Sequence, residues 1–264
     1  MKTMRIEQFT CFGSSDGGGN PALVIEDGPA DAAQRVALAR AHALTCVFID
    51  AAGESGVAAS LDFVYPHMRS PLCLHATLAA AQVLFARHGD AAPLTVETAM
   101  HGQRLTLSRN GETVFVRLVR QPAPQAALDD ALAARLLAAP GLRLASAPRI
   151  ASVGSPKLLL EVADGATLHG LRPDLALIQD WGKENGVSGC YAWCRLGDGE
   201  VEGRNFNHLD PLLEDSATGV AAGALTVLLG HGLLLRQGRA SGNACVIHTQ
   251  REGDAVLVGG LVRS

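Results

Sequence analysis

Two segments of the chain are apolar on every side when they are read as helices. The first runs from residue 72 to residue 85 and is followed by basic residues and by Gly89, a typical helix end. The second covers residues 213 to 229, is rich in alanine and leucine, and is closed by His231 and Gly232. Because a helix that is apolar all round is a buried one, the pattern predicts two central helices with other elements around them.

The polar residues of both segments gather where each helix is expected to start. Cys73 and His75 fall in the first turn of the first helix, while Asp215 and Ser216, both good N-cap residues, open the second. The unpaired backbone N–H groups and the positive dipole end of a helix N-terminus favour anions and thiolates. Placing Cys73 over Ser216 aligns the two segments, so we interpret the chain as an internal duplication.

Shorter alternating or β-branched segments, bounded by Gly, Pro, Asn and Asp, predict strands in both halves. They cover residues 4–10, 22–25, 45–49, 61–65, 94–97, 103–108, 113–118, 149–154, 157–162, 190–195, 201–206, 244–248 and 256–260. Peripheral helices are expected from Asp31 through Ala43, over residues 128–138, and from Pro173 to about residue 185. The predicted fold class is therefore α+β, with a mixed sheet or barrel wrapped around one central helix in each half.

The segment from Gln121 to Gln125 contains two prolines and is typical of a linker. It predicts an N-terminal barrel-and-helix domain over residues 1–121 and a C-terminal one over residues 122–264, with the last strand free to return to the first domain. The glycines before Asn20 are not spaced as a phosphate-binding loop, and no Lys-Ser or Lys-Thr follows them, which argues against nucleotide binding.

The composition of the 264 residues is that of a globular protein with a sizeable core, since 48% are hydrophobic and 18% charged. A net charge of −4 and the lack of basic runs argue against nucleic acid as a partner. A charged N-terminus and the lack of a long apolar run predict a cytoplasmic protein with no signal peptide and no membrane span. The cysteines have no metal-ligand spacing, so we expect reduced thiols and no metal site. Cys190 and Cys194 share one face of a strand, which suits packing.

A set of short motifs follows in order along the chain. The motifs are Gly19-Asn20-Pro21, Val47-Phe48, Cys73-Leu74-His75-Ala76-Thr77-Leu78, Arg204-Asn205-Phe206 and Glu214-Asp215-Ser216-Ala217-Thr218-Gly219. As a set they resemble the phenazine-biosynthesis PhzF-like family. The resemblance implies the diaminopimelate-epimerase-like fold, two similar domains with the active site in the cleft between them. It also implies cofactor-independent isomerase or epimerase chemistry at a carbon next to a carboxylate, and a homodimer.

The sequence departs from the family pattern at several positions. Thr45 stands where family isomerases carry an acid/base Glu, and Arg69 stands where another Glu is expected. Leu74 replaces the Gly of the Cys-Gly-His motif, and Val220 replaces a Ser. In the related epimerases and racemases a cysteine opens each of the two helices, whereas here the second position is Ser216. The pattern has therefore kept one cysteine and lost its familiar partner.

Cys73 is the best candidate for the base that removes a proton alpha to a carboxylate. Helix N-termini stabilise the growing negative charge, and a thiolate placed there serves as base. His75 orients the substrate, donates a proton or caps its helix, and Asp215 lines the site or is only a cap; these alternatives stay open. Arg69 either binds a substrate carboxylate or is solvated. The expected substrate-binding residues are Asn20, Thr45, Leu74, Ser216, Ala217, Thr218 and Gly219.

The predicted function is that of a cofactor-independent isomerase or epimerase. Its substrate would be a small amino-acid-like or hydroxy acid whose proton alpha to the carboxylate is moved. One-base chemistry is favoured, because Cys73 is the one strong base that remains, although Asp215 or a water can supply a second proton. A racemase or dehydratase of an amino acid is the alternative, as is a catalytically inactive relative that binds a small acid.

Overall fold

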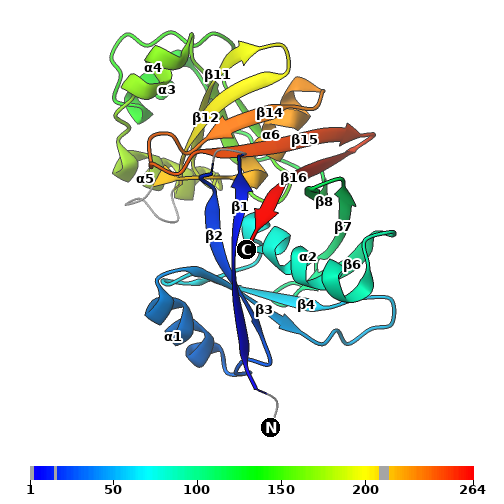
Figure 1. The fold of residues 1–264 in the computed structure, drawn as a ribbon. Coiled ribbons are helices and arrows are strands. Elements are labelled where there is room, and N and C mark those ends of the chain that lie inside the picture. Colours follow the sequence, from blue (N-terminus) through cyan, green and yellow to red (C-terminus); the bar gives the residue numbers. More distant parts are fainter. Residues whose placement is uncertain (1–2, 15–16, 208–213) are drawn as a thin grey trace. The chain divides into compact units, whose positions relative to one another are not determined.

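The computed structural model describes residues 3–14, 17–207 and 214–264 (Figure 1). The chain forms two compact units: unit 1 is Met1–Arg117 with Gly259–Ser264, and unit 2 is Leu118–Val258. The division at Arg117 lies a few residues before the linker from which the sequence placed the boundary. Residue 213, where the second apolar segment was expected to begin, lies outside the described residues.

Unit 1 is a mixed barrel around one helix. Its sheet runs in the order β1-β2-β3-β4-β6-β7-β8, and β16 lies between β8 and β1, which closes the barrel. The strands are β1 (Arg5–Gly13), β2 (Asn20–Glu26), β3 (Thr45–Asp50), β4 (Ser60–Val64), β6 (Leu94–Thr98), β7 (Arg104–Asn110), β8 (Thr113–Val119) and the end of β16 (Ala255–Arg263), with the short β5 (Arg69–Ser70) paired to β4. The pairs β2–β3 and β4–β6 are parallel, as expected of a mixed sheet.

The central helix of unit 1 is α2 (Leu74–His88), and it packs against β1, β2, β3 and β4 (Figure 1). Ten of its side chains are buried, on all sides of the helix. Gly89 ends it with a positive φ of 81°, where a residue without Cβ is favoured. The predicted buried helix and its stop are confirmed, and Cys73 is the N-cap residue.

The peripheral helix α1 (Ala32–His42) follows the sequence pattern closely. The Asp31 carboxylate accepts a hydrogen bond from the backbone N–H of Gln34 at 2.9 Å, as an N-cap does. Ala43 is the C-cap, in the left-handed conformation. The helix packs Ala39 and partly buried aliphatic side chains against Ile25, Cys46 and Phe48 of the barrel.

Unit 2 is a second mixed sheet with helices on both faces. Its strands follow the order β15-β14-β12-β11-β10-β9, with β13 paired to β12 and the start of β16 beside β15. They are β9 (Arg149–Ala151), β10 (Lys157–Glu161), β11 (Cys190–Gly197), β12 (Glu200–Phe206), β13 (Glu214–Asp215), β14 (Leu234–Gln237) and β15 (Cys245–Glu252). The central helix α6 (Gly219–Leu229) contacts β9, β10 and β15 on the inner face.

The outer face of this sheet carries α3 (Asp130–Leu136), α4 (Gly165–Gly170) and α5 (Leu175–Asn185). Their apolar side chains form one cluster with Leu158 and Leu160 of β10 and with Cys190 and Cys194 of β11. The two cysteines therefore pack on one face, as their spacing predicted. Helix α4 was missed because it is only six residues long. With one closed barrel and one mixed sheet, each packed on a central helix, the predicted α+β fold class is confirmed.

The start of α6 differs from the prediction. Asp215 and Ser216 are not N-cap residues; the N-cap is Thr218, and the helix ends at Gly230 rather than at His231 and Gly232. The physical reason is a backbone constraint, because Asp215 pairs with Asn205 as the last residue of strand β13. Residue 215 is therefore extended, and the helix begins at Gly219.

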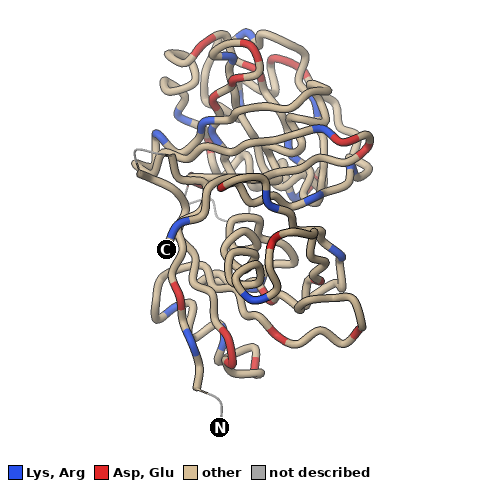
Figure 2. Tube along the Cα trace, turned by 45° about the vertical axis from the view of Figure 1, so that its right-hand side comes forward, with Lys and Arg blue, Asp and Glu red and all other residues tan. Residues whose placement is uncertain are grey.

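Arg69 belongs to an ion-pair network on unit 1. Its guanidinium donates to Oδ1 of Asp62 at 2.8 Å, while the other oxygen of Asp62 receives Arg35 at 2.9 Å. Arg35 also holds Asp50 through two hydrogen bonds of 2.8 Å. Arg69 is thus paired rather than simply solvated, and its charge is engaged within the unit. Elsewhere in both units Lys and Arg are interspersed with Asp and Glu (Figure 2).

None of the helices in the described part of the chain has the length and hydropathy needed to cross a bilayer.

This network makes Asp62 a key residue for stability. The Asp62 side chain is 2% exposed, whereas that of Asp50 is 40% exposed. We expect Asp62→Ala to lower the free energy of unfolding by about 3 kcal/mol, because it leaves buried positive charge poorly compensated. Asp50→Ala, the matched control, should lower it by about 1 kcal/mol or less, because Arg35 keeps Asp62. Urea unfolding of both variants measures the difference, and equal losses would contradict the assignment.

Candidate functional site

A cysteine, a histidine and an asparagine meet at the start of α2 in unit 1. Sγ of Cys73 lies 3.3 Å from Nδ1 of His75, and the amide nitrogen of Asn20 lies 3.4 Å from the same ring nitrogen. The Cys73 and His75 side chains are buried. Three residues chosen from sequence motifs, one of them more than fifty positions away, therefore form one polar cluster, which we call the Cys73 cluster.

Local backbone geometry explains how Asn20 reaches this cluster. Gly19 has φ of 109°, and a Cβ there would lie 2.5 Å from the methyl group of Thr10. A glycine is therefore required at this position, and it turns the chain so that β2 begins at Asn20. Asn20 pairs with Cys11 of β1, and this register fixes the position of Asn20 along the strands of the barrel.

The histidine of the Cys73 cluster is held neutral. Burial lowers the pKa of His75 to about 4 from its ordinary 6.5. Because an amide NH₂ group can only donate, Nδ1 of the neutral ring is the acceptor for Asn20, and the same atom can accept from the Cys73 thiol. The geometry thus fits a neutral imidazole that carries its proton on Nε2.

Two further candidates, Leu74 and Thr45, also belong to unit 1. Leu74 is the first residue of α2 and is buried. Thr45 is the first residue of β3, half-buried and paired with Ala22 of β2. A hydroxyl at this position has no titratable proton near neutral pH, so Thr45 cannot replace a Glu as acid or base.

A second polar cluster lies before α6 in unit 2. The Thr218 hydroxyl donates to Oδ2 of Asp215 at 2.6 Å, and Gln237 donates from Nε2 to the Asp215 carbonyl at 2.7 Å and to Thr218 Oγ1 at 3.0 Å. The backbone N–H of Thr218 and the hydroxyl of Tyr191 both donate to Oε1 of Gln237, at 3.2 Å and 3.1 Å. In this Asp215 cluster the carboxylate accepts from Thr218, while Gln237 holds the backbone of Asp215.

Electrostatics favour a proton on the carboxylate of this cluster. Burial raises the pKa of Asp215, and the hydrogen bond from Thr218 offsets this in part. A nearby lysine, Lys157, also favours the charged form of Asp215. The combination is that of a carboxyl group that can exchange protons closer to neutrality than a solvated one.

The other residues of the second motif have lesser polar roles. Ser216 shares a hydrogen bond with the Ser241 hydroxyl, Oγ to Oγ, at 2.9 Å. Ala217 and Gly219 are buried at the start of α6 and carry no side-chain polar group. Ser216 is thus not the counterpart of Cys73 at a helix N-cap, since that place belongs to Thr218.

Sequence reasoning missed three members of this region: Lys157, Tyr191 and Gln237. The side chain of each is buried and carries a polar group. A lysine opening a run of leucines, as in residues 157–160, was the signal that was available in the sequence.

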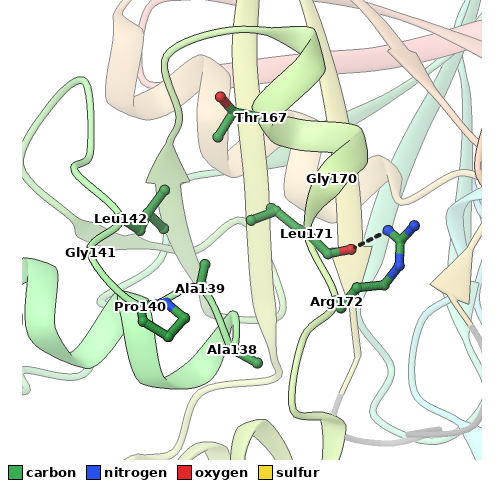
Figure 3. Close-up of a pocket in the computed structure, with 9 residues that line it drawn as sticks. All are labelled: Ala138, Ala139, Pro140, Gly141, Leu142, Thr167, Gly170, Leu171 and Arg172. Atoms are coloured by element: carbon green, nitrogen blue, oxygen red, sulfur yellow. Dashed lines mark hydrogen bonds between the residues drawn. The ribbon is translucent and has the colours of Figure 1, made fainter.

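Two cavities of unit 2 lie apart from the polar clusters. One has a volume of about 370 Å³, and none of its lining residues is Asp, Glu, His or Cys, so it is unsuited to proton transfer (Figure 3). The lining residues are Ala138, Ala139, Pro140, Gly141, Leu142, Thr167, Gly170, Leu171 and Arg172. The other, of about 910 Å³, contains Arg204, which Glu214 holds through two hydrogen bonds. Within the described ranges, no group of His, Cys, Asp and Glu is arranged to hold a metal ion.

Comparison with known proteins adds family information. The family model for phenazine biosynthesis-like proteins, PhzC-PhzF, matches residues 9–260. A protein of Deinococcus radiodurans named as an uncharacterized isomerase is 32% identical over 260 residues, which is 90% of this chain and 80% of that protein. A predicted epimerase of Pseudomonas aeruginosa has a similar structure, with a TM-score of 0.80, 25% identity and coverage of 99% and 96% of the two chains.

The fold also extends to more distant enzymes. A hydroxyproline epimerase of Agrobacterium vitis, solved with bound trans-4-hydroxy-L-proline, has a TM-score of 0.63 at 12% identity. The alignment covers 99% of this chain and 90% of that one. At this identity the likeness concerns the fold alone.

The buried histidine gives a pH dependence of stability. The pKa of His75 is about 4 in the folded protein and about 6.5 in the unfolded chain. As the pH falls, the unfolded state therefore binds a proton first. We expect the contribution of His75 to be intact above pH 6.5 and to be lost progressively towards pH 4, by up to about 3 kcal/mol. Urea unfolding at several pH values, with His75→Gln as control, measures it. Parallel curves for the two proteins would contradict the assignment.

Proposed function

The chain belongs to the family of phenazine biosynthesis-like proteins and is an enzyme of the isomerase and epimerase type, and we propose that it moves a proton at a carbon alpha to a carboxylate. The substrate class is a small amino-acid-like or hydroxy acid, and the reaction uses no cofactor. The observation that carries the proposal is the contact of 3.3 Å between Cys73 Sγ and His75 Nδ1 at the start of a buried helix.

Cys73 is the proposed base. Its thiolate takes the α-proton, so that the C–H bond breaks, an S–H bond forms, and the electron pair moves toward the substrate carboxylate. The backbone N–H groups of the first turn of α2 have no partner within the helix and favour such negative charge. The neutral His75 ring accepts at Nδ1 from the Cys73 thiol once the sulfur carries the proton, and the Asn20 amide donates to the same nitrogen and holds the ring in place.

Reprotonation completes the reaction. A proton returned to the same carbon on its other face gives an epimer, and one returned to a neighbouring carbon gives a shifted double bond. We propose Asp215 as the proton donor, supported by its raised pKa and by the hydrogen bond from Thr218. Delivery breaks the O–H bond of the Asp215 carboxyl group and forms the new C–H bond.

Loss of a β-substituent after the first step would instead make the enzyme a dehydratase. The alternative of an inactive small-acid-binding relative is motivated by Thr45, which cannot act as an acid or base. The same assay distinguishes the two alternatives, because the dehydratase gives an elimination product and the inactive relative gives no product.

Exchange of the α-proton with solvent tests the proposed base. The protein is incubated in deuterated water with a panel of small amino and hydroxy acids, hydroxyproline among them, and α-deuterium is measured by NMR. We expect incorporation with at least one acid, and we expect Cys73→Ala to lower its rate by about 10²-fold or more. A β-elimination product would identify the dehydratase.

Cys46→Ala is the matched control. Cys46 is also buried in unit 1, and burial raises its pKa to about 11, so it stays a thiol. This variant should exchange at the wild-type rate. If Cys73→Ala exchanged as fast as Cys46→Ala, the proposed base would be wrong. Binding of an acid without exchange across the panel would favour the inactive relative.

A further inference from the structure

The side-chain amide of Gln237 links the polar groups that lie before α6 in unit 2. Gln237 is the last residue of β14 and is 2% exposed. Its amide makes four hydrogen bonds to described residues, two at Oε1 and two at Nε2. An amide has two donors and two acceptor sites, so its full hydrogen-bonding capacity is used within the fold.

Two backbone groups determine which end of this amide is the oxygen. The backbone N–H of Thr218 can only donate, and it meets Oε1 of Gln237 at 3.2 Å. The backbone carbonyl of Asp215 can only accept, and it meets Nε2 at 2.7 Å. Exchanging the oxygen and the nitrogen would bring two donors together at one end and two acceptors at the other. The amide therefore has one orientation that satisfies its partners.

A tyrosine hydroxyl holds the oxygen end of the amide. The hydroxyl of the fully buried Tyr191 donates to Oε1 of Gln237 at 3.1 Å. Space for this hydroxyl comes from Gly203 on β12, because a Cβ at Gly203 would lie only 2.1 Å from the Tyr191 hydroxyl oxygen. Gly203 is also the register partner of Gln237 in the parallel pair of β12 and β14. The sheet thus makes room for this hydrogen bond beside Gln237.

The second N–H of the amide sets the direction of the Thr218 hydroxyl. Nε2 of Gln237 donates to Thr218 Oγ1 at 3.0 Å, so the hydroxyl oxygen is the acceptor in this contact. The hydroxyl proton is then directed to Oδ2 of Asp215, which lies 2.6 Å from Oγ1. The donors therefore follow one another from Gln237 to Thr218 to Asp215, and Oδ2 is the final acceptor.

This direction distinguishes the two oxygens of the Asp215 carboxyl group. If Oδ2 carried the acid proton, it would have to donate to Thr218 Oγ1. The Thr218 hydroxyl proton would then have no acceptor among the described residues. Thr218 is buried, and a buried donor without a partner costs free energy. The acid proton of Asp215, when it is present, is therefore favoured on Oδ1.

We propose that Gln237 is a positioning residue that directs the Thr218 hydroxyl at Oδ2 of Asp215 and so makes Oδ1 the oxygen that holds and delivers the proton. The inference rests on the proposed function, in which Asp215 is the proton donor. On delivery the O–H bond at Oδ1 breaks, a C–H bond forms on the substrate, and the electron pair of the O–H bond stays on the carboxylate. Gln237 acts through Thr218, since its own donors and acceptors are all engaged within the fold.

The hydrogen-bond direction is tested first on the unmutated protein without substrate. Neutron diffraction from crystals grown in deuterated water locates the exchangeable hydrogen atoms directly. We expect the Thr218 deuterium to point at Oδ2 of Asp215, and the acid deuterium to lie on Oδ1 in crystals kept at a pH where the carboxyl group is protonated. A Thr218 deuterium that points at Gln237, or an acid deuterium on Oδ2, would overturn the proposal.

The role of Gln237 in this direction is tested with Gln237→Met. Methionine has a similar length but cannot donate to Thr218 Oγ1. The Thr218 hydroxyl proton, assigned in NMR spectra by its loss in Thr218→Val, should exchange with water about tenfold faster in this variant. Thr226 of the same helix is the internal control, because its buried hydroxyl meets Thr249 Oγ1 at 2.6 Å and should not respond. Equal exchange of the Thr218 proton in both proteins would contradict the assignment.

The functional part is tested by the ratio of product formed to α-deuterium exchanged. Cys73 can exchange the α-proton by returning a deuteron to the face from which it took the proton, whereas the epimer or shifted isomer needs Asp215. We expect Gln237→Met to lower this ratio about tenfold, because the donor oxygen is no longer defined. Gln250→Met is the matched control, since Gln250 is exposed on β15, and it should keep the wild-type ratio. A ratio that stays the same in Gln237→Met would overturn the proposal.

The three tests also separate this inference from the proposed function. If the wild-type protein exchanged no α-proton with any acid, the proposed function would fail, while the two substrate-free measurements would still test the hydrogen-bond chain. If exchange depended on Cys73 but the ratio did not respond to Gln237, the proposed function would stand and the role of Gln237 would fall.

Discussion

The beginning of a buried helix is the constraint on which both units depend. The first backbone N–H groups of a helix have no partner within it, and burial removes the water that would otherwise satisfy them. Apolar side chains all round α2 and α6 force both helices into the interior, and polar residues therefore gather at their N-terminal ends. Burial at these two helix starts lowers the pKa of His75 and raises the pKa of Asp215.

The two units meet this constraint with different chemistry. Unit 1 places an extended Cys73 at the N-cap and adds an imidazole and an amide around its sulfur. Unit 2 extends a strand up to Asp215 and joins it to Thr218 and Gln237 by hydrogen bonds. The two units thus share a buried helix but differ in the side chains at its start.

Each unit contains a buried basic side chain, Arg35 in unit 1 and Lys157 in unit 2. In unit 1, Asp62 engages both Arg35 and Arg69, so the arginine that replaces a family Glu is neutralised within the unit. In unit 2, Nζ of Lys157 donates to the carbonyl of Ser188. Burial makes the ion pairs of Asp62 sensitive to the loss of one partner, because little water is present to take its place.

Elements whose cause is local could be predicted from the sequence alone. The apolar surface of α2, the Asp31 cap of α1, the glycine that stops α2 and the shared face of Cys190 and Cys194 all follow from periodicity and capping chemistry. The motifs also identified Asn20, Cys73 and His75 as candidate site residues, and the fold brings these three side chains together. Their identity was readable because each motif is a contiguous run.

Only the tertiary structure decided the features that depend on strand pairing between distant segments. The pairing of Asp215 with Asn205 keeps residue 215 extended and moves the start of α6 to Gly219, which no local pattern indicates. The ion pair of Arg69 requires Asp62 on the adjacent strand. The burial of Lys157 depends on which face of β10 turns inward. Side-chain burial and charge pairing are set by neighbours far away in the chain, and for that reason the sequence alone could not assign them.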